Sequence, residues 1–274
     1  MISELFRIGP ISISPFGVML VVAFFAAYQQ LRWGMGKLAA GDEEDASALL
    51  LAAAVGGLLG GKIYYAILQG DWRSLFERAG IVFYGSLIAG AAAVLLVVRW
   101  RRLPLWKLVD ACAPSVAIGY ALGRVGCLLV GDDYGVPTEL PWGMTFPEGP
   151  IPTTARDLER FFGVEVPAGY GPSDQVPVHP TQLYETILAL GIWWVGRRLI
   201  ERGLAPGRAG LIVVGLLAVE RFAIEFLRAK DDRLLGPLTV AQGISVGIVV
   251  LVIVLLALRR PAAAATATPE PSRR

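Results

Sequence analysis

Long apolar stretches recur along the chain and alternate with short polar segments. Seven of them approach membrane-crossing length, and they cover about residues 12–31, 47–69, 81–98, 108–130, 182–200, 209–228 and 239–258. A helix needs about 20 mostly apolar residues to cross the roughly 30 Å hydrocarbon core of a bilayer. The last stretch is the clearest, since ISVGIVVLVIVLLAL carries no charge, and the fourth and sixth are weaker because they contain charges. The pattern predicts an all-α, polytopic membrane protein with about seven transmembrane helices.

Loop charges predict the orientation of these helices. The start of the chain lacks a basic n-region and an obvious small-residue cleavage site, so we interpret the first stretch as a retained span. With the N-terminus outside, the cytoplasmic segments hold fourteen Lys and Arg residues and the outer segments hold eight. Cytoplasmic loops of membrane proteins carry the excess of Lys and Arg. We therefore expect the N-terminus outside and the C-terminus in the cytoplasm.

Two segments do not fit the membrane pattern. Residues 131–180 contain nine prolines and many turn residues, and a segment of this length is too long for a tight loop. We expect an outer-face lobe there, within a single transmembrane domain that covers residues 1–260. Residues 261–274 are low-complexity, and we expect a disordered cytoplasmic tail.

Composition narrows the class of protein further. Hydrophobic residues make up 55% of the chain, charged residues 18%, and the net charge is +2. These values exclude a disordered chain and a nucleic-acid binder that depends on bulk charge. The two cysteines, Cys112 and Cys127, lie in one apolar stretch and form no disulfide framework. A single histidine excludes a multi-histidine metal site, and we expect no metal and no nucleic-acid partner.

Charges inside the sixth stretch mark a candidate site. Arg221, Glu225 and Arg228 are spaced i, i+4 and i+7, which on a helix places them on one face. They could form a salt-bridged stripe that holds helices together. Two arginines around one carboxylate would instead leave a net positive charge, which suits an anionic ligand.

The fourth stretch carries Arg124 among several glycines. The glycines could serve close helix packing, or they could let a phosphate-bearing head group approach the backbone while Arg124 binds the phosphate. Asp110, near the inner end of the same stretch, is interpreted as structural, with Lys107 or a polar backbone group as its partner.

The predicted topology places polar groups from five segments at one level. Lys62, Tyr84 and Arg124 fall in the outer halves of their stretches, with the three charges of the sixth stretch. His179 precedes the helix start at Thr181, and its role is either structural or catalytic. We infer a cavity that opens toward the outer leaflet and the lobe.

Several segments, in order along the chain, resemble the prolipoprotein diacylglyceryl transferase family. They are GGKIYYAI, IVFYGSLIAG, GRVGCLLVGDDYG, LPWGMTFP, HPTQLYE and ERFAIEFLR. The resemblance implies seven spans with the N-terminus outside, in the bacterial cytoplasmic (inner) membrane. It implies transfer of a diacylglyceryl group from phosphatidylglycerol to the lipobox cysteine of a prolipoprotein signal peptide. Glycerol phosphate is released and no cofactor is used.

The resemblance also implies a set of site residues. Arg124 is expected to bind phosphatidylglycerol, and Arg221 with Glu225 to form a second polar core. The candidate catalytic residues are Arg124, Arg221, Glu225, Tyr84 and His179. The candidate substrate-binding residues are Arg124, Gly126, Asp132, Gly135, Arg228 and Lys62.

The chain departs from the family pattern at several polar positions. Tyr84 stands where histidine is usual and Cys127 where asparagine is usual, while Phe16, Leu217 and Lys62 replace two tyrosines and an arginine. A phenol, with a reference pKa of about 10, is a poor base at neutral pH. The alternative is therefore a non-catalytic homologue that binds an anionic lipid or peptide. A small transporter fits less well, because the charges cluster on one side and no inverted repeat is visible.

Overall fold

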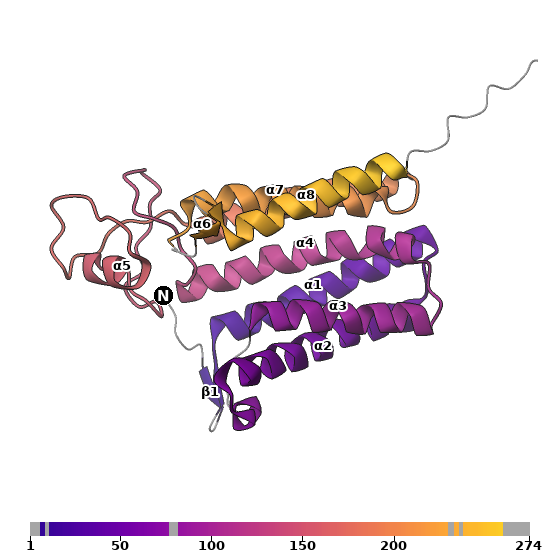
Figure 1. Cartoon of the computed structure of the whole chain (residues 1–274), viewed down its shortest axis with the longest axis horizontal. Coiled ribbons are helices and arrows are strands. Elements are labelled where there is room, and N and C mark those ends of the chain that lie inside the picture. Colours follow the sequence, from indigo (N-terminus) through magenta and orange to yellow (C-terminus); the bar gives the residue numbers. More distant parts are fainter. Residues whose placement is uncertain (1–5, 9–10, 77–81, 230–232, 236–237, 260–274) are drawn as a thin grey trace, which may run out of the picture.

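The chain folds into a bundle of long helices with a lobe at one end (Figure 1). The computed structural model describes residues 6–8, 11–76, 82–229, 233–235 and 238–259. The long helices are α1 (Pro15–Leu38), α2 (Glu43–Gln69), α3 (Phe83–Trp100), α4 (Leu105–Val130), α6 (Thr181–Glu201), α7 (Arg208–Ile224) and α8 (Val240–Leu258). The lobe between α4 and α6 contains the short helix α5 (Ala155–Phe162). Two antiparallel ribbons complete the described part, β1 (Phe6–Ile8) with β2 (Ile11–Ile13) and β3 (Arg233–Leu235) with β4 (Leu238–Thr239).

Local sequence signals set the helix ends. Asp42 and Thr239 each form a capping box at the start of α2 and α8, in which the cap side chain accepts from the third helical amide. Ser14 caps α1 in front of Pro15. Gly131 ends α4 with a positive φ of 76°, a conformation that glycine adopts without strain. The chain therefore turns into the lobe directly after α4.

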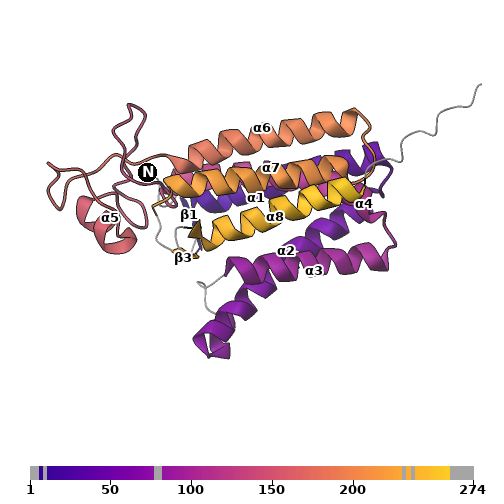
Figure 2. The same cartoon turned by 45° about the horizontal axis from the view of Figure 1, so that its top comes forward.

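Successive long helices run in opposite directions (Figures 1 and 2), so the α1–α2, α3–α4 and α6–α7 turns lie at the end away from the lobe. α4 lies centrally and packs against α1, α6 and α7, while α7 packs against α8. α2 and α3 form a hairpin that meets the rest of the bundle mainly along α1. Each predicted apolar stretch corresponds to one of these helices, with end shifts of a few residues. Four of them, α1, α2, α4 and α8, are long and apolar enough to cross a membrane.

The hairpin and the bundle meet in a hydrophobic core at the end away from the lobe. Met35, Leu49, Val98 and Leu108, from α1, α2, α3 and α4, are buried in one cluster. Between this core and the lobe end, the same four helices border an apolar groove of about 570 Å³. The groove extends from Leu31 and Leu49 to Tyr120 on α4. Residues 261–274, where we expected a disordered tail, lie outside the described residues.

Asp110 holds the start of α7 against α4. Its Oδ2 accepts from the Gly207 amide and its Oδ1 from the Gly210 amide, both at 2.7 Å, and the residue is 2% exposed. These amides belong to the first turn of a helix, where donors lack intrahelical partners. The structure confirms the structural interpretation of Asp110, with backbone amides as its partners.

Replacing Asp110 should weaken the fold. We expect Asp110→Ala to lower the free energy of unfolding by about 2–3 kcal/mol, because two buried amides lose a charged acceptor. Thermal unfolding in detergent measures the effect. Asp174→Ala in the lobe, where the side chain accepts from the Gly171 amide near the surface, is the matched control. An unchanged unfolding temperature for Asp110→Ala would contradict this role.

Candidate functional site

A buried ion pair joins α4 to α6 at the lobe end of the bundle. The Nε of Arg124 lies 2.7 Å from Oε2 of Glu185, and its Nη2 donates to Oε1 at 3.0 Å. The hydroxyl of Tyr120, one turn before Arg124, also donates to Glu185 Oε1 at 2.9 Å. Glu185 is fully buried. A buried carboxylate is tolerated only when paired and hydrogen-bonded, so Arg124 and Tyr120 account for its position.

Asp133 connects Arg124 to a second arginine. Its Oδ2 accepts from Arg124 Nη1 at 2.8 Å and its Oδ1 accepts from Arg228 Nη2 at 2.6 Å. Burial acts to raise the pKa of Asp133, but Arg228 and Arg124 outweigh burial and hold this pKa below its usual value. The backbone of Asp133 has a φ of 59°, which few non-glycine residues adopt. Such conformations cluster at functional sites, where the surroundings hold them in place.

Arg221, Glu225 and Arg228 lie together, but they do not share one helical face. Arg221 Nη1 pairs with Glu225 Oε2 at 2.5 Å, as the i, i+4 spacing predicts. The α-helix ends at Ile224, and Glu225–Leu227 form the 3₁₀ turn η2. Arg228 is extended and forms an antiparallel bridge with Gly135 of the lobe. The single-face prediction is therefore wrong at Arg228, because pairing with the lobe draws the chain out of the helix.

Gly135 lies where three segments of the chain cross. Its amide donates to the His179 carbonyl, and the next amide, of Val136, donates to the Leu227 carbonyl, both at 2.8 Å. A Cβ at Gly135 would collide with the Leu227 carbonyl and the side chains of His179 and Thr181. Gly126 similarly lies against Phe16 and Met19 of α1. Both glycines thus permit close packing that positions the site.

Asp132 borders a cavity of about 210 Å³ between the lobe and the segment that follows η2. Arg228, Asp133 and Tyr134 also line this cavity. The carbonyl of Asp132 accepts from the Gln182 side chain at 2.6 Å, which fixes the backbone. Its carboxylate Oδ1 is buried without a hydrogen-bond partner among the described residues. Burial raises the pKa of Asp132 above its usual value.

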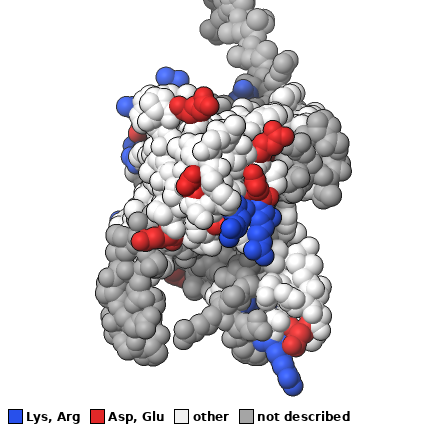
Figure 3. Space-filling model, turned by 90° about the vertical axis from the view of Figure 1, so that its left-hand side faces the viewer, with Lys and Arg blue, Asp and Glu red and all other residues white. Residues whose placement is uncertain are grey.

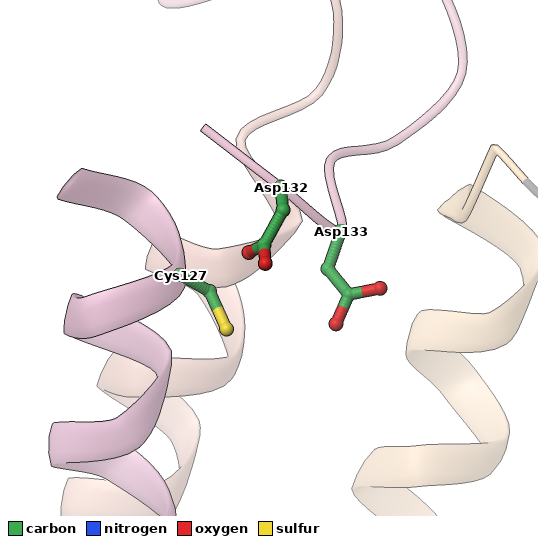
Figure 4. A group of neighbouring side chains, drawn as sticks. All are labelled: Cys127, Asp132 and Asp133. Carbon is green, nitrogen blue, oxygen red and sulfur yellow. The ribbon is translucent and has the colours of Figure 1, made fainter. Parts of the chain in front are cut away.

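Among the residues that the structure describes, Cys127, Asp132 and Asp133 form a group that could offer ligands to a metal ion. One potential ligand atom from each lies within 4.8 Å of the others (Figure 4). Both Asp133 oxygens are already bound by guanidinium groups, and Arg124 Nη1 lies 3.7 Å from Cys127 Sγ. Two arginines at this position balance the negative charge that would otherwise attract a cation. This position therefore favours an anion bound by the two arginines over a metal ion.

His179 is linked to two aromatic side chains near the start of α6. Its Nδ1 lies 3.3 Å from the Tyr184 hydroxyl, to which Trp142 Nε1 donates at 2.7 Å. Burial lowers the pKa of His179 below its usual value, which favours the neutral imidazole at neutral pH. The backbone of His179 is bonded to Gly135 and Val136. The structural role is therefore evident, and a catalytic role remains a prediction.

Lys62 and Tyr84 lie on the α2–α3 hairpin. The Val82 amide donates to the Gly61 carbonyl at 3.3 Å, so the two side chains flank the place where the helices meet. Tyr84 is 42% exposed. The structure thus brings together Arg124, Arg221, Glu225, Arg228 and Asp132, while Lys62 and Tyr84 lie on the hairpin.

Sequence reasoning missed three carboxylates of the site. Glu185 is the last residue of HPTQLYE and falls one turn after Gln182, so both occupy the helix face toward α4 and the lobe. Asp133 is adjacent to the predicted Asp132, and Glu220 on α7 is 5% exposed next to Arg221. The site does not carry the net positive charge that the sequence led us to expect, because these carboxylates neutralise the arginines. The lobe-end surface also mixes acidic and basic side chains (Figure 3), so any charge selectivity depends on the inner cluster.

Comparisons with known proteins agree with this arrangement. Residues 3–258 match the family model described as prolipoprotein diacylglyceryl transferase. A phosphatidylglycerol–prolipoprotein diacylglyceryl transferase of Xylella fastidiosa strain M12 is 30% identical over 266 residues, covering 89% of this chain and 88% of its own. The enzyme of the same name from Clostridium tetani is 29% identical, with 90% and 93% covered. This chain belongs to the prolipoprotein diacylglyceryl transferase family of membrane enzymes.

Proposed function

We propose that this protein transfers the diacylglyceryl group of phosphatidylglycerol to the lipobox cysteine thiol of a prolipoprotein and releases glycerol phosphate. Relatives with 29–30% identity are named for phosphatidylglycerol and prolipoprotein. The observation that carries the proposal is the arginine pair Arg124 and Arg228, bridged by Asp133 and linked through Tyr120 to an apolar groove. Guanidinium groups bind phosphate through parallel hydrogen bonds.

The groove between α1, α2, α3 and α4 supports a lipid substrate. Its volume is about 570 Å³, and apolar side chains such as Leu20, Phe24 and Leu87 dominate its lining. Tyr120 lies at its end and also bonds to Glu185 and, at 3.3 Å, to Arg124 Nε. One residue therefore belongs to both the groove and the ion cluster. This continuity would place acyl chains in the groove and a phosphate at the arginines.

The arginines can promote the reaction by stabilising the leaving group. The thiol sulfur forms a bond to the glycerol carbon, and the bond between that carbon and the phosphate oxygen breaks. Negative charge grows on the departing phosphate, where fixed guanidinium donors act most strongly in a site shielded from water. Holding lipid and peptide together supplies proximity. The thiol must lose its proton to become nucleophilic, and Tyr84 and His179 are the proposed participants in proton transfer.

We further propose that all seven long helices cross the bacterial inner membrane, with the lobe outside. The end away from the lobe carries arginines stacked on tryptophans, with Arg197 4.0 Å from the Trp33 ring centroid and Arg259 3.6 Å from that of Trp106. Tryptophan favours the membrane interface, and arginine excess favours the cytoplasmic side. The tryptophans support a membrane interface at this end, and the arginines support the orientation expected from the sequence.

A reconstituted assay tests the proposal. Purified protein is incubated with phosphatidylglycerol vesicles and a synthetic lipobox peptide, and mass spectrometry follows the peptide. We expect a mass gain of one diacylglyceryl group, with glycerol phosphate released in equal amount. A peptide with serine in place of the cysteine is the control. Phosphatidylglycerol binding without any mass gain, beside an active relative, would favour the non-catalytic homologue.

Tyr84→Phe probes the residue in the usual histidine position. We expect about a tenfold lower transfer rate, because one hydrogen bond worth about 1–1.5 kcal/mol would be lost. The comparison is made at saturating lipid and peptide, with Tyr170→Phe in the exposed part of the lobe as the matched control. An unchanged rate would remove the Tyr84 hydroxyl from the mechanism.

A further inference from the structure

The two arginines that would bind a lipid phosphate already hold carboxylates. Arg124 pairs with Glu185 and Asp133, and Arg228 pairs with Asp133 at 2.6 Å. A phosphate cannot simply be added, because its negative charge would join an already neutralised cluster. Phosphate binding therefore requires that one carboxylate leave the arginines.

Glu185 is poorly suited to leave. It lies on helix α6, is fully buried, and accepts an additional hydrogen bond from Tyr120. Moving it would place a charge against apolar neighbours, at a cost of several kcal/mol. Its contacts mark it as the permanent counterion of Arg124.

Asp133 is well suited to leave. It lies in the turn after α4, and its side chain is 44% exposed, so water can solvate the released carboxylate. It also borders the 210 Å³ cavity that Arg228 lines. Its two oxygens each accept from a different guanidinium, at 2.8 and 2.6 Å. Two oxygens of a phosphodiester can occupy the same two positions.

Arg228 also has donors available for a phosphate. Its side chain is 8% exposed, and its Nε and Nη1 lack hydrogen-bond partners among the described residues. The nearest carboxylate oxygens, of Glu225 and Glu185, are 3.8 and 3.7 Å away. A buried guanidinium with unused donors favours a further oxygen-rich ligand.

We propose that the Asp133 carboxylate occupies the phosphate position in the empty enzyme and that the phosphodiester of the lipid substrate displaces it. The inference rests on the proposed function and adds a residue that sets affinity. Only the fraction of molecules with Asp133 released is competent to bind, so the apparent Kd equals the intrinsic Kd divided by that fraction. Asp133 is thus a specificity-determining residue. A ligand binds the arginine pair only if it competes successfully with the Asp133 carboxylate.

Asp133→Asn tests this competition. Asparagine is nearly isosteric and tolerates a φ of 59°, so the backbone is preserved while the charge is lost. In nanodiscs of phosphatidylcholine with increasing phosphatidylglycerol, we expect the KM for phosphatidylglycerol to fall at least about tenfold. We expect kcat to change less than about threefold, because the bound ground state and the transition state are stabilised equally relative to the free enzyme. Glu139→Gln, an exposed charge change in the lobe, should match wild type.

The outcomes separate the two proposals. A KM that stays equal or rises in Asp133→Asn, with wild type active, would overturn the displacement and leave the transferase intact. A wild type that neither binds phosphatidylglycerol nor transfers would overturn both. Infrared difference spectra of wild type with ¹³C-labelled aspartate give a test without any variant. We expect a carboxylate band shift when phosphatidylglycerol is added to phosphatidylcholine nanodiscs, and no shift would contradict the displacement.

Discussion

Arg124→Ala is expected to abolish diacylglyceryl transfer. The substitution removes the guanidinium that contacts Glu185, Asp133 and Tyr120 at the end of the apolar groove. Loss of a donor to a developing oxyanion costs about 10²–10³-fold in rate, and loss of phosphate binding adds to this. The lipobox peptide assay measures the rate, and fractionation shows whether the variant is still inserted in the membrane.

A charge-preserving variant separates chemistry from folding. Arg124→Ala leaves Glu185 buried with fewer partners, so reduced stability could contribute to the loss. Arg124→Lys keeps the positive charge but lacks the planar fork that holds two acceptors. We expect it to remain folded and to lose at least about 10²-fold in rate. Arg156→Ala in the lobe serves as the control, and full activity of Arg124→Ala would refute the site assignment.

Glu185→Gln is expected to lower the free energy of unfolding by about 3–5 kcal/mol, because breaking a buried pair leaves an uncompensated charge. Glu185 is fully buried and lies within ion-pair distance of both Arg124 and Arg228. The loss is measured by thermal unfolding in detergent and by transfer activity at a temperature where the variant is still folded. An unfolding temperature equal to wild type would contradict the role of Glu185 as the permanent counterion.

A matched substitution tests whether the effect is specific to this position. Glu201→Gln, at the other end of the same helix, changes the same charge where the side chain is 38% exposed and pairs with Arg198. Exposed pairs contribute about 0–1 kcal/mol, so this variant should unfold close to the wild-type temperature.

The helices could be predicted from the sequence because an apolar stretch of about 20 residues between polar segments is typical of a long membrane helix. All seven stretches correspond to helices, and the polar run after Val130 forms the lobe. The extended geometry of Arg228 could not be predicted from spacing. It depends on the bridge to Gly135, a contact between segments about ninety residues apart. Helical periodicity describes only local geometry, so such a contact overrides it without leaving a local signal.

The cations of the candidate site were predicted from the sequence, as were Glu225 and Asp132, but Glu185, Asp133 and Glu220 were missed. Arg124, Arg221 and Arg228 are conspicuous because a charge in an apolar stretch is costly. Glu185 lies in a polar helix start, and Asp133 lies in a loop, where acidic residues are common. Their importance appears only when folding buries one and places the other between two arginines.

In the proposed reaction, the groove bordered by α1 to α4 determines which measure of lipid concentration controls the rate. In the proposed function the lipid enters this apolar groove from the surrounding bilayer, so it would arrive by two-dimensional diffusion. The relevant variable is then the mole fraction of the lipid in the membrane or micelle. Adding inert detergent at a fixed amount of phosphatidylglycerol should slow the reaction by surface dilution. Rates for this protein are therefore comparable only when lipid is expressed per unit of membrane surface.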